Sequence, residues 1–184
     1  YLSAKLSLAG NKIAVLSRGY KRNSGRPGAA GMGDEPAMLA AKFPAVKVVV
    51  NKNRIKAAQA AIRDYACGIL ILDDGLQQWK IFKDLEIVTI DAGNPFGNYR
   101  MLPAGFLREP LSALKRADIF VLTQNCLGQD LSGLTAKLKS INSRALIVES
   151  RHEPKGVSWL DQADEFLDPE FLKGKPVAIF SGIG

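Results

Sequence analysis

The chain has 184 residues, of which 47% are hydrophobic and 23% are charged, as is ordinary for a soluble globular protein. Its cysteines, Cys67 and Cys126, and its single histidine, His152, exclude a disulfide framework, a Cys-x-x-Cys zinc site and a site of several histidines. The net charge of +7 favours an anionic partner such as a nucleotide, a nucleic acid, a phosphorylated small molecule or a lipid surface, although solubility alone would also explain it.

Predicted helices and strands alternate along the chain. In chain order we expect a helix at 1–8, a strand at 12–16, a helix at 37–43, a strand at 46–50, a helix at 53–65, strands at 68–72 and 85–91, a helix at 108–116, a strand at 119–123, a helix at 131–141 and strands at 145–149 and 176–180. In the helix at 53–65 we expect Ile55, Ala58, Ala61 and Ile62 on the buried face. Residues 151–173 are polar and less regular. The alternation predicts an α/β fold with three layers, built on a mostly parallel sheet.

The most informative stretch is the strand expected at 68–72, because four consecutive aliphatic residues run directly into Asp73, Asp74 and Gly75. Such a run predicts a strand buried on both faces of a parallel sheet, where ligands bind at the carboxyl ends of the strands. An acid in this position can hold the Mg²⁺ of a bound nucleotide. A plain turn of the Asp-Gly type is an equally good interpretation of this stretch alone.

Two further loops carry charged residues at places where a ligand could bind. Arg18 follows the strand at 12–16 and offers a planar fork to a phosphate, or it lies in a solvated turn. Asp34 precedes the helix at 37–43 and either caps it or forms, with Glu35, a second acidic pair that faces the first.

A third loop, residues 92–110, is long and rich in glycine, proline and asparagine, and structured loops of this length are usually functional. Arg108 near its end either binds a phosphate or forms an ion pair with Glu109 or a helix cap.

Several loops resemble, in order, the motifs of the tetraacyldisaccharide 4'-kinase family, the lipid A 4'-kinases. These motifs are SRGY at 17–20, GDEP at 33–36, DDGLQ at 73–77, DLEI at 84–87, LPAG at 102–105, LREPLS at 107–112 and KRAD at 115–118. The terminal FSGIG at 180–184 is similar to a later turn of the family. The resemblance covers nearly the whole chain.

The resemblance implies a P-loop NTPase-like fold, with residues 1–125 as the core of a nucleotide- and substrate-binding domain and 126–184 continuing into a second α/β subdomain. It implies transfer of the γ-phosphoryl group of ATP to the 4'-hydroxyl of a tetraacylated glucosamine disaccharide 1-phosphate, the lipid A precursor, in a reaction that needs Mg²⁺. We expect a membrane surface as a partner, at the cytoplasmic face of a bacterial inner membrane or in a plant organelle, and no nucleic acid.

The resemblance also suggests roles for individual residues. Asp34 would act as the general base, with Asp74 as the second catalytic residue. Carboxylates that would hold Mg²⁺ are those of Glu35, Asp73 and Asp74. Residues expected to contact the nucleotide or the phosphorylated sugar are Ser17, Arg18, Tyr20, Gln77, Arg100 and Arg108.

The chain departs from the family pattern in three respects. It contains no Gly-x-x-x-x-Gly-Lys-Thr phosphate loop, and it has Gln78 where the family usually has His and Lys21 where Gly is usual. We therefore expect a piece of a longer protein that binds ATP weakly and turns over none by itself. The alternative is a nonenzymatic α/β domain that binds glycolipid or nucleic acid, although lysine and arginine are too dispersed to favour nucleic acid.

Overall fold

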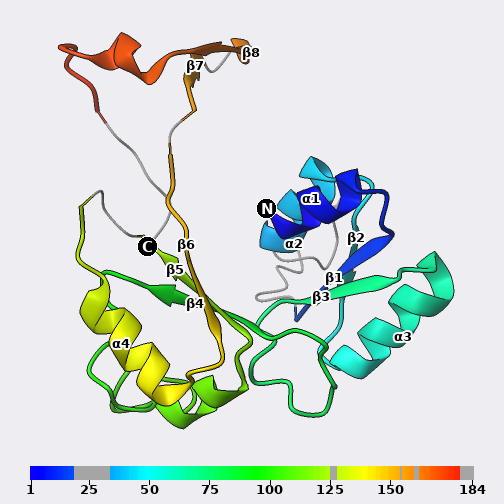
Figure 1. Ribbon diagram of the computed structural model, residues 1–184. Coiled ribbons are helices and arrows are strands. Elements are labelled where there is room, and N and C mark those ends of the chain that lie inside the picture. The colour runs from blue at the N-terminus through cyan, green and yellow to red at the C-terminus, as the bar shows by residue number, and fades with distance from the viewer. Residues whose placement is uncertain (19–33, 125–127, 154, 160–161, 179–184) are drawn as a thin grey trace.

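The computed structural model describes residues 1–18, 34–124, 128–153, 155–159 and 162–178. Two three-stranded parallel sheets lie side by side, and a small antiparallel hairpin lies apart from both (Figure 1). Among the described residues, no helix is long and apolar enough to cross a membrane. The α/β fold with mostly parallel strands is confirmed, but the strands are divided between two sheets.

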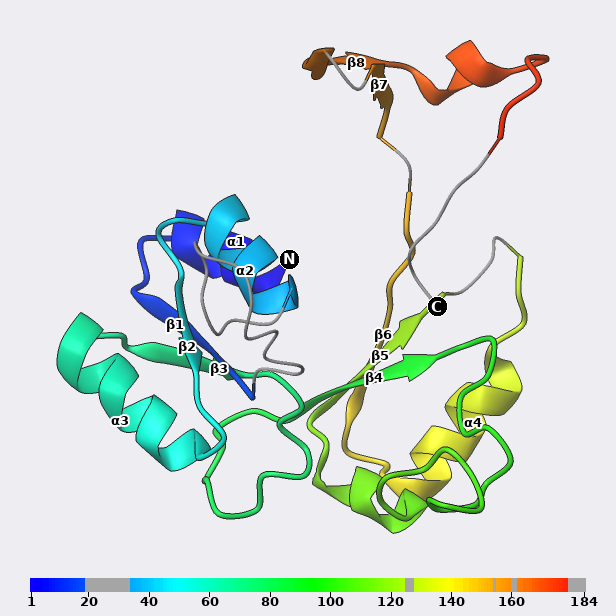
Figure 2. The same ribbon diagram turned by 180° about the vertical axis from the view of Figure 1, so that it is seen from behind.

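The first sheet has helices on both faces. Its elements are α1 (Leu2–Leu8), β1 (Ile13–Ser17), α2 (Asp34–Lys42), β2 (Lys47–Val50), α3 (Arg54–Tyr65) and β3 (Ile69–Leu72), with the strand order β2-β1-β3. Ala14 and Leu16 pack against α3, whereas Ile13 and Val15 pack toward α1 and α2. The view from behind shows α3 on one side of this sheet and the other two helices on the opposite side (Figure 2).

The central strand of the first sheet is β1, because it pairs with β2 on one side and with β3 on the other. All five of its residues are buried. The prediction that the strand before Asp73 is buried on both faces is wrong: β3 lies at the sheet edge and all four of its residues are half-buried. An aliphatic run therefore reports a strand but does not distinguish the edge from the centre.

Helix α3 begins as predicted, because the side chain of Asn53 accepts hydrogen bonds from the backbone N–H groups of Ile55 and Lys56. Its buried face differs from the prediction of Ile55, Ala58, Ala61 and Ile62. Ala57 and Ala61 are fully buried, whereas Ile55 and Ile62 are exposed. Small residues face the sheet here, so the helix packs close to it.

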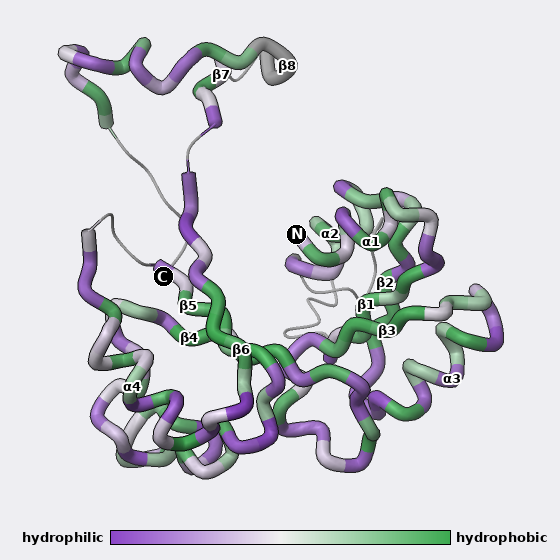
Figure 3. The backbone as a smooth tube through the Cα atoms, viewed as in Figure 1, coloured by the Kyte–Doolittle hydropathy of each residue, from purple (hydrophilic) through white to green (hydrophobic). Residues whose placement is uncertain are grey.

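Among the described residues, the second sheet is covered by helices on one face. Its elements are β4 (Ile87–Asp91), the 3₁₀ helix η1 (Leu111–Arg116), β5 (Ile119–Thr123), α4 (Ser132–Ile141) and β6 (Leu146–Glu149), with the strand order β4-β5-β6. Phe120, Leu122 and Leu138 are fully buried in one core. Val148 on β6 is exposed. Figure 3 shows the hydrophobic segments following the strands of both sheets.

The last described elements form a hairpin where the sequence suggested no regular structure. They are β7 (Val157–Trp159), which pairs antiparallel with β8 (Gln162–Leu167), and the 3₁₀ helix η2 (Pro169–Leu172). The strand expected at 176–180 is not seen at 176–178, and residues 179–184 lie outside the described part. The domain division at residue 125 stays a prediction; within this chain it falls between β5 and β6, which pair with each other.

Candidate functional site

The two acids predicted at a strand end lie directly after β3, at the carboxyl edge of the first sheet, and both are exposed. The N–H of Asp73 donates to the carbonyl oxygen of Leu16 at 3.1 Å, which continues the pairing with β1 by one residue. Asp74 has φ of 54°, a left-handed conformation that aspartate tolerates better than most residues. We call Asp73, Asp74 and Gly75 the acidic turn.

One residue of β1 and one residue of α3 hold Asp73. The hydroxyl of Ser17, the last residue of β1, donates to Asp73 Oδ2 at 3.2 Å. Arg54, the first residue of α3, donates from Nη2 to the Asp73 carbonyl oxygen at 3.3 Å and from Nη1 to the Asn51 carbonyl oxygen at 2.9 Å. Ser17 is therefore at the site as predicted, although the structure contains no ligand that would test a binding role.

Arg54 is a site residue that the sequence interpretation missed. It is only 4% exposed, and its Nε has no hydrogen-bond partner among the described residues. Burial lowers the pKa of its guanidinium from the ordinary value, while the charges of Asp73 and Asp74 act in the opposite direction. The sequence contained a signal for Arg54. It begins the helix that follows the strand β2, and the loop after a parallel strand lies at the same sheet edge as the acids.

Arg108 reaches the acidic turn from the long loop. Its Nη1 donates to Asp74 Oδ2 at 3.1 Å, and both side chains are more than half exposed. The alternative ion pair with Glu109 is wrong, because Glu109 pairs with Arg116 instead. An exposed pair of this kind contributes little to stability, so its main effect is to place a cation beside the carboxylate.

The long loop of residues 92–110 is held in shape by hydrogen bonds within its own backbone. Leu107 N–H donates to the Arg100 carbonyl at 3.1 Å and Leu102 N–H to the Leu107 carbonyl at 2.9 Å. A Cβ atom at Gly105 would come within 2.2 Å of the Arg100 carbonyl oxygen, so only glycine fits there. The Arg100 side chain is exposed.

The remaining predicted site residues are either exposed or lie outside the described part. Arg18 and Gln77 are exposed, and Glu35 is exposed in the first turn of α2. Asp34 is the first residue of α2, so it starts the helix, and its side chain lies outside the described part. Tyr20 lies outside it as well.

A shared four-acid metal site is not seen in the part of the chain that the structure describes. There, no three or more His, Cys, Asp or Glu side chains are grouped so that they could hold a metal ion. Because the Asp34 side chain is not described, the convergence of Asp34, Glu35, Asp73 and Asp74 stays a prediction. Asp73 and Asp74 are neighbours in sequence, and both lie at the carboxyl edge of the first sheet.

Asp91 offers a useful contrast, since it also ends a parallel strand. Its Oδ1 accepts hydrogen bonds from the backbone N–H groups of Gly93 at 2.8 Å and Asn94 at 3.4 Å. Its carboxylate therefore shapes its own loop. At the acidic turn, by contrast, the carboxylates contact Ser17 and Arg108 from other segments.

Comparisons with known proteins agree with the motif order. The family model described as tetraacyldisaccharide-1-P 4'-kinase matches residues 1–184. A curated tetraacyldisaccharide 4'-kinase from Anaeromyxobacter dehalogenans is 39% identical over 99% of this chain and 51% of its own length. A second, from Halothermothrix orenii, is 39% identical over 82% of this chain and 43% of its own length.

A solved structure is also similar. It is the "apo" form of LpxK from Aquifex aeolicus in complex with ATP, with a TM-score of 0.63, 29% sequence identity, and coverage of 95% of this chain and 56% of that chain. The likeness supports the P-loop kinase fold predicted from the motifs. The chain spans about half the length of the curated relatives named here.

Proposed function

The chain belongs to the tetraacyldisaccharide-1-P 4'-kinase family, and from that premise we propose that the full-length protein transfers the γ-phosphoryl group of ATP to the 4'-hydroxyl of a tetraacylated glucosamine disaccharide 1-phosphate. The product would carry phosphate at both ends of the disaccharide. The observation that carries the proposal is the acidic turn at the carboxyl edge of a parallel sheet, in a chain whose residues 1–184 match the family model.

The chemistry of the acidic turn suits Mg²⁺. This ion prefers hard oxygen ligands and is usually held by one or two carboxylates together with substrate phosphates and water. Asp73 and Asp74 supply two exposed carboxylates at adjacent positions. Bound Mg²⁺ would neutralise charge on the phosphates during transfer. We propose Asp73 and Asp74, with help from Glu35, as the residues that hold it.

The chain's own residues would then orient the reactants. Asp34 would accept the proton of the attacking 4'-hydroxyl, as a general base within hydrogen-bond reach of it. Ser17 and Arg54 keep Asp73 in place through the contacts described above. Arg108, already beside Asp74, would meet a phosphate of the nucleotide or the sugar, because a guanidinium binds phosphate in a forked geometry.

The other predicted contacts belong to the same proposal. Arg18, Tyr20 and Gln77 would contact the nucleotide or the sugar, and Arg100 would contact the phosphate of the disaccharide. The solved relative was crystallised in complex with ATP, which supports ATP as the donor here. Because the acceptor carries four acyl chains, we place the reaction at a membrane surface, on the cytoplasmic face of the bacterial inner membrane.

The test is a transfer assay on the full-length protein with γ-labelled ATP, Mg²⁺ and tetraacyldisaccharide 1-phosphate. We expect label on the disaccharide at the 4'-position. Asp34→Asn keeps the size of the side chain but removes the proton acceptor, so kcat should fall about 10²–10⁴-fold with little change in KM for ATP. That loss corresponds to roughly 3–5 kcal/mol of barrier.

A titration with Mg²⁺ separates the roles of the acids. Raising Mg²⁺ should recover part of the rate of Asp74→Asn but none of the rate of Asp34→Asn. If both variants respond alike, the assignment of roles fails. If the wild-type protein binds the disaccharide without transferring phosphate, or binds generic DNA in a salt-dependent way instead, the kinase proposal fails.

A further inference from the structure

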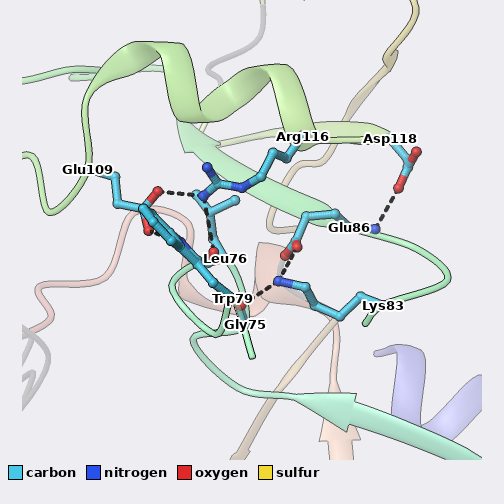
Figure 4. Close-up of polar contacts among 8 residues, drawn as sticks. All are labelled: Gly75, Leu76, Trp79, Lys83, Glu86, Glu109, Arg116 and Asp118. Atoms are coloured by element: carbon cyan, nitrogen blue, oxygen red, sulfur yellow. Dashed lines mark hydrogen bonds and ion pairs between the residues drawn. The ribbon is translucent and has the colours of Figure 1, made fainter. Parts of the chain in front are cut away.

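The backbone immediately after the acidic turn is held by two cations. Lys83 Nζ donates to the carbonyl oxygen of Gly75 at 2.9 Å, and Arg116 Nη2 donates to the carbonyl oxygen of Leu76 at 3.2 Å (Figure 4). These carbonyls are consecutive, and they lie one and two residues beyond Asp74. A hydrogen bond from a charged donor is stronger than one between neutral groups, so both carbonyls are firmly placed.

The Lys83 contact is anchored at the amino edge of the second sheet. Lys83 forms an ion pair with Glu86, and the two side chains are only 17% and 10% exposed. The backbone N–H of Glu86 donates to Asp118 Oδ2 at 2.8 Å, directly before β5. Because the pair is shielded from water, its attraction is screened less than that of a surface pair.

The Arg116 contact is anchored beside it. Arg116, at the end of η1, forms an ion pair with Glu109, whose side chain is 13% exposed. The indole N–H of Trp79 donates to Glu109 Oε1 at 3.0 Å, and the Arg116 guanidinium lies 5.3 Å from the centre of the Trp79 ring. Figure 4 shows the Trp79 side chain next to Glu109 and Arg116. The ring thus contacts both charged groups.

We infer that Lys83 and Arg116 are positioning residues, which together with Glu86 and Glu109 form a clasp that fixes the acidic turn for phosphoryl transfer. The inference rests on the proposed function. Neither cation contacts Asp73 or Asp74 in the described structure; each acts through the backbone that follows them. A displacement of about 1 Å in a catalytic geometry can cost about 100-fold in rate, so a loosened turn should be visible in kcat.

The clasp also explains how a left-handed residue is held at an exposed edge. Asp74 keeps φ of 54° between two fixed points: the Asp73 N–H bonded to Leu16 on one side, and the Gly75 and Leu76 carbonyls on the other. The Asp73 N–H is bonded to a strand of the first sheet. The two carbonyls are bonded to Lys83 and Arg116, which precede strands of the second sheet. The acidic turn is therefore positioned by both halves of the molecule.

The test compares Arg116→Gln with Arg63→Gln in the full-length protein. Arg63 is the matched control, because it is an exposed arginine paired with a neighbouring carboxylate, Asp64, in the last turn of α3, at the end of the helix opposite Arg54. We expect kcat of Arg116→Gln to fall about 10- to 100-fold, with a higher Mg²⁺ concentration for half-maximal rate. Arg63→Gln should stay within about twofold of wild type in both quantities.

A double variant distinguishes positioning from a general loss of stability. If the clasp acts through the acidic turn, Arg116→Gln should cost little more than about twofold when Asp74 is already Asn. A purely structural role predicts that the two losses multiply, and that result would overturn the inference. Arg116→Lys keeps the charge but not the forked reach, so it serves if Arg116→Gln does not fold.

Amide hydrogen exchange gives a readout that does not depend on kinase activity. In the protein without substrates, Arg116→Gln and Lys83→Met should speed exchange at residues 73–78, whereas Arg63→Gln should not. Unchanged exchange in both clasp variants would contradict the inference even if the enzyme is a kinase. Faster exchange in a protein that transfers no phosphate would leave the clasp standing and reject the proposed function.

Discussion

Both sheets present an aspartate at the carboxyl end of a parallel strand, yet the two aspartates do different things. Asp91 turns back on its own loop, where it accepts backbone hydrogen bonds from Gly93 and Asn94. Asp73 and Asp74 instead meet side chains from β1 and from the long loop. An apolar strand followed by an acid therefore does not identify a site. The partners that reach the acid from other segments do.

The sheets differ in cover as well. In β1 all five residues are buried, whereas in β5 the fully buried residues, Phe120 and Leu122, alternate with half-buried ones. The first sheet packs against helices on both faces, and the second packs against α4 and η1 on one face. The sheet that carries the acidic turn is thus the more completely enclosed of the two, which suits a site that needs a rigid support.

The largest expected effect tests whether the second sheet has a core as firm as that of the first. Phe120 is 0% exposed, so Phe120→Ala should lower the free energy of unfolding by about 3–5 kcal/mol. Phe106, 77% exposed in the long loop, is the control, and Phe106→Ala should change stability little. The measurement is urea unfolding followed by circular dichroism. Equal losses would mean that the core of the second sheet is not formed.

The next effect sharpens the contrast between the two aspartates. In the full-length enzyme, Asp74→Asn should lower kcat about 100-fold, or ~2.7 kcal/mol of barrier, because a charge that supports the transition state is lost. Asp91→Asn should retain most of the activity, since an amide oxygen can still accept the bonds from Gly93 and Asn94. Steady-state transfer rates at saturating ATP provide the measurement. Similar losses in both variants would show that Asp91 supports catalysis as much as Asp74 does.

A pair of matched valines tests the difference in cover. Val15 lies in the middle of β1 and is 5% exposed, whereas Val121 lies in the middle of β5 and is half-buried. Val15→Ala should lower the free energy of unfolding by about 2 kcal/mol and Val121→Ala by roughly half as much, because folding buries less apolar area at Val121 than at Val15. Urea midpoints give both values. A larger loss at Val121 would show that the second face of that sheet is covered.

The smallest effect concerns the helix that precedes the acidic strand. Asn53 caps α3 through two backbone N–H groups, so Asn53→Ala should lower the free energy of unfolding by about 1 kcal/mol. Asn53→Asp keeps the acceptor and is the control. Because Arg54 follows directly, thermal unfolding and transfer rates should be measured on the same samples. A rate loss without a stability loss would indicate that the cap acts on the site rather than on the helix.

Much of the fold could be predicted from the sequence, because local patterns specify local elements. The strand at 119–123 and the helix at 53–65 were predicted correctly, and so was the position of Asp73 and Asp74 at a strand end. The edge position of β3 could not be predicted, since an aliphatic run reads alike at the edge and in the centre. The choice of Ala57 over Ile55 for the buried face of α3 depends on how close the helix lies to the sheet.

The contacts of the site were harder to predict than its position. Arg108 has Glu109 as its neighbour in sequence, but it pairs with Asp74, which is far from it in the chain. Glu109 pairs with Arg116 because η1 brings the two side chains close together. This pairing cannot be predicted without the fold. Arg54 was missed because a charged residue at a helix start is most simply interpreted as solvated. Long-range electrostatic choices of this kind follow from packing rather than from local pattern.

The order of strands along the chain has a consequence for how the protein is made. All described strands of the first sheet have been synthesised once β3 has been made, whereas Arg108 and Arg116 emerge later, and β6, the last described strand of the second sheet, emerges later still. At about 5–20 residues per second, several seconds of translation separate these events, and folding during synthesis starts from the N-terminal end. The nascent chain would thus carry a folded sheet with an unclamped acidic turn. The site would acquire its final geometry only after the second half of the chain has left the ribosome.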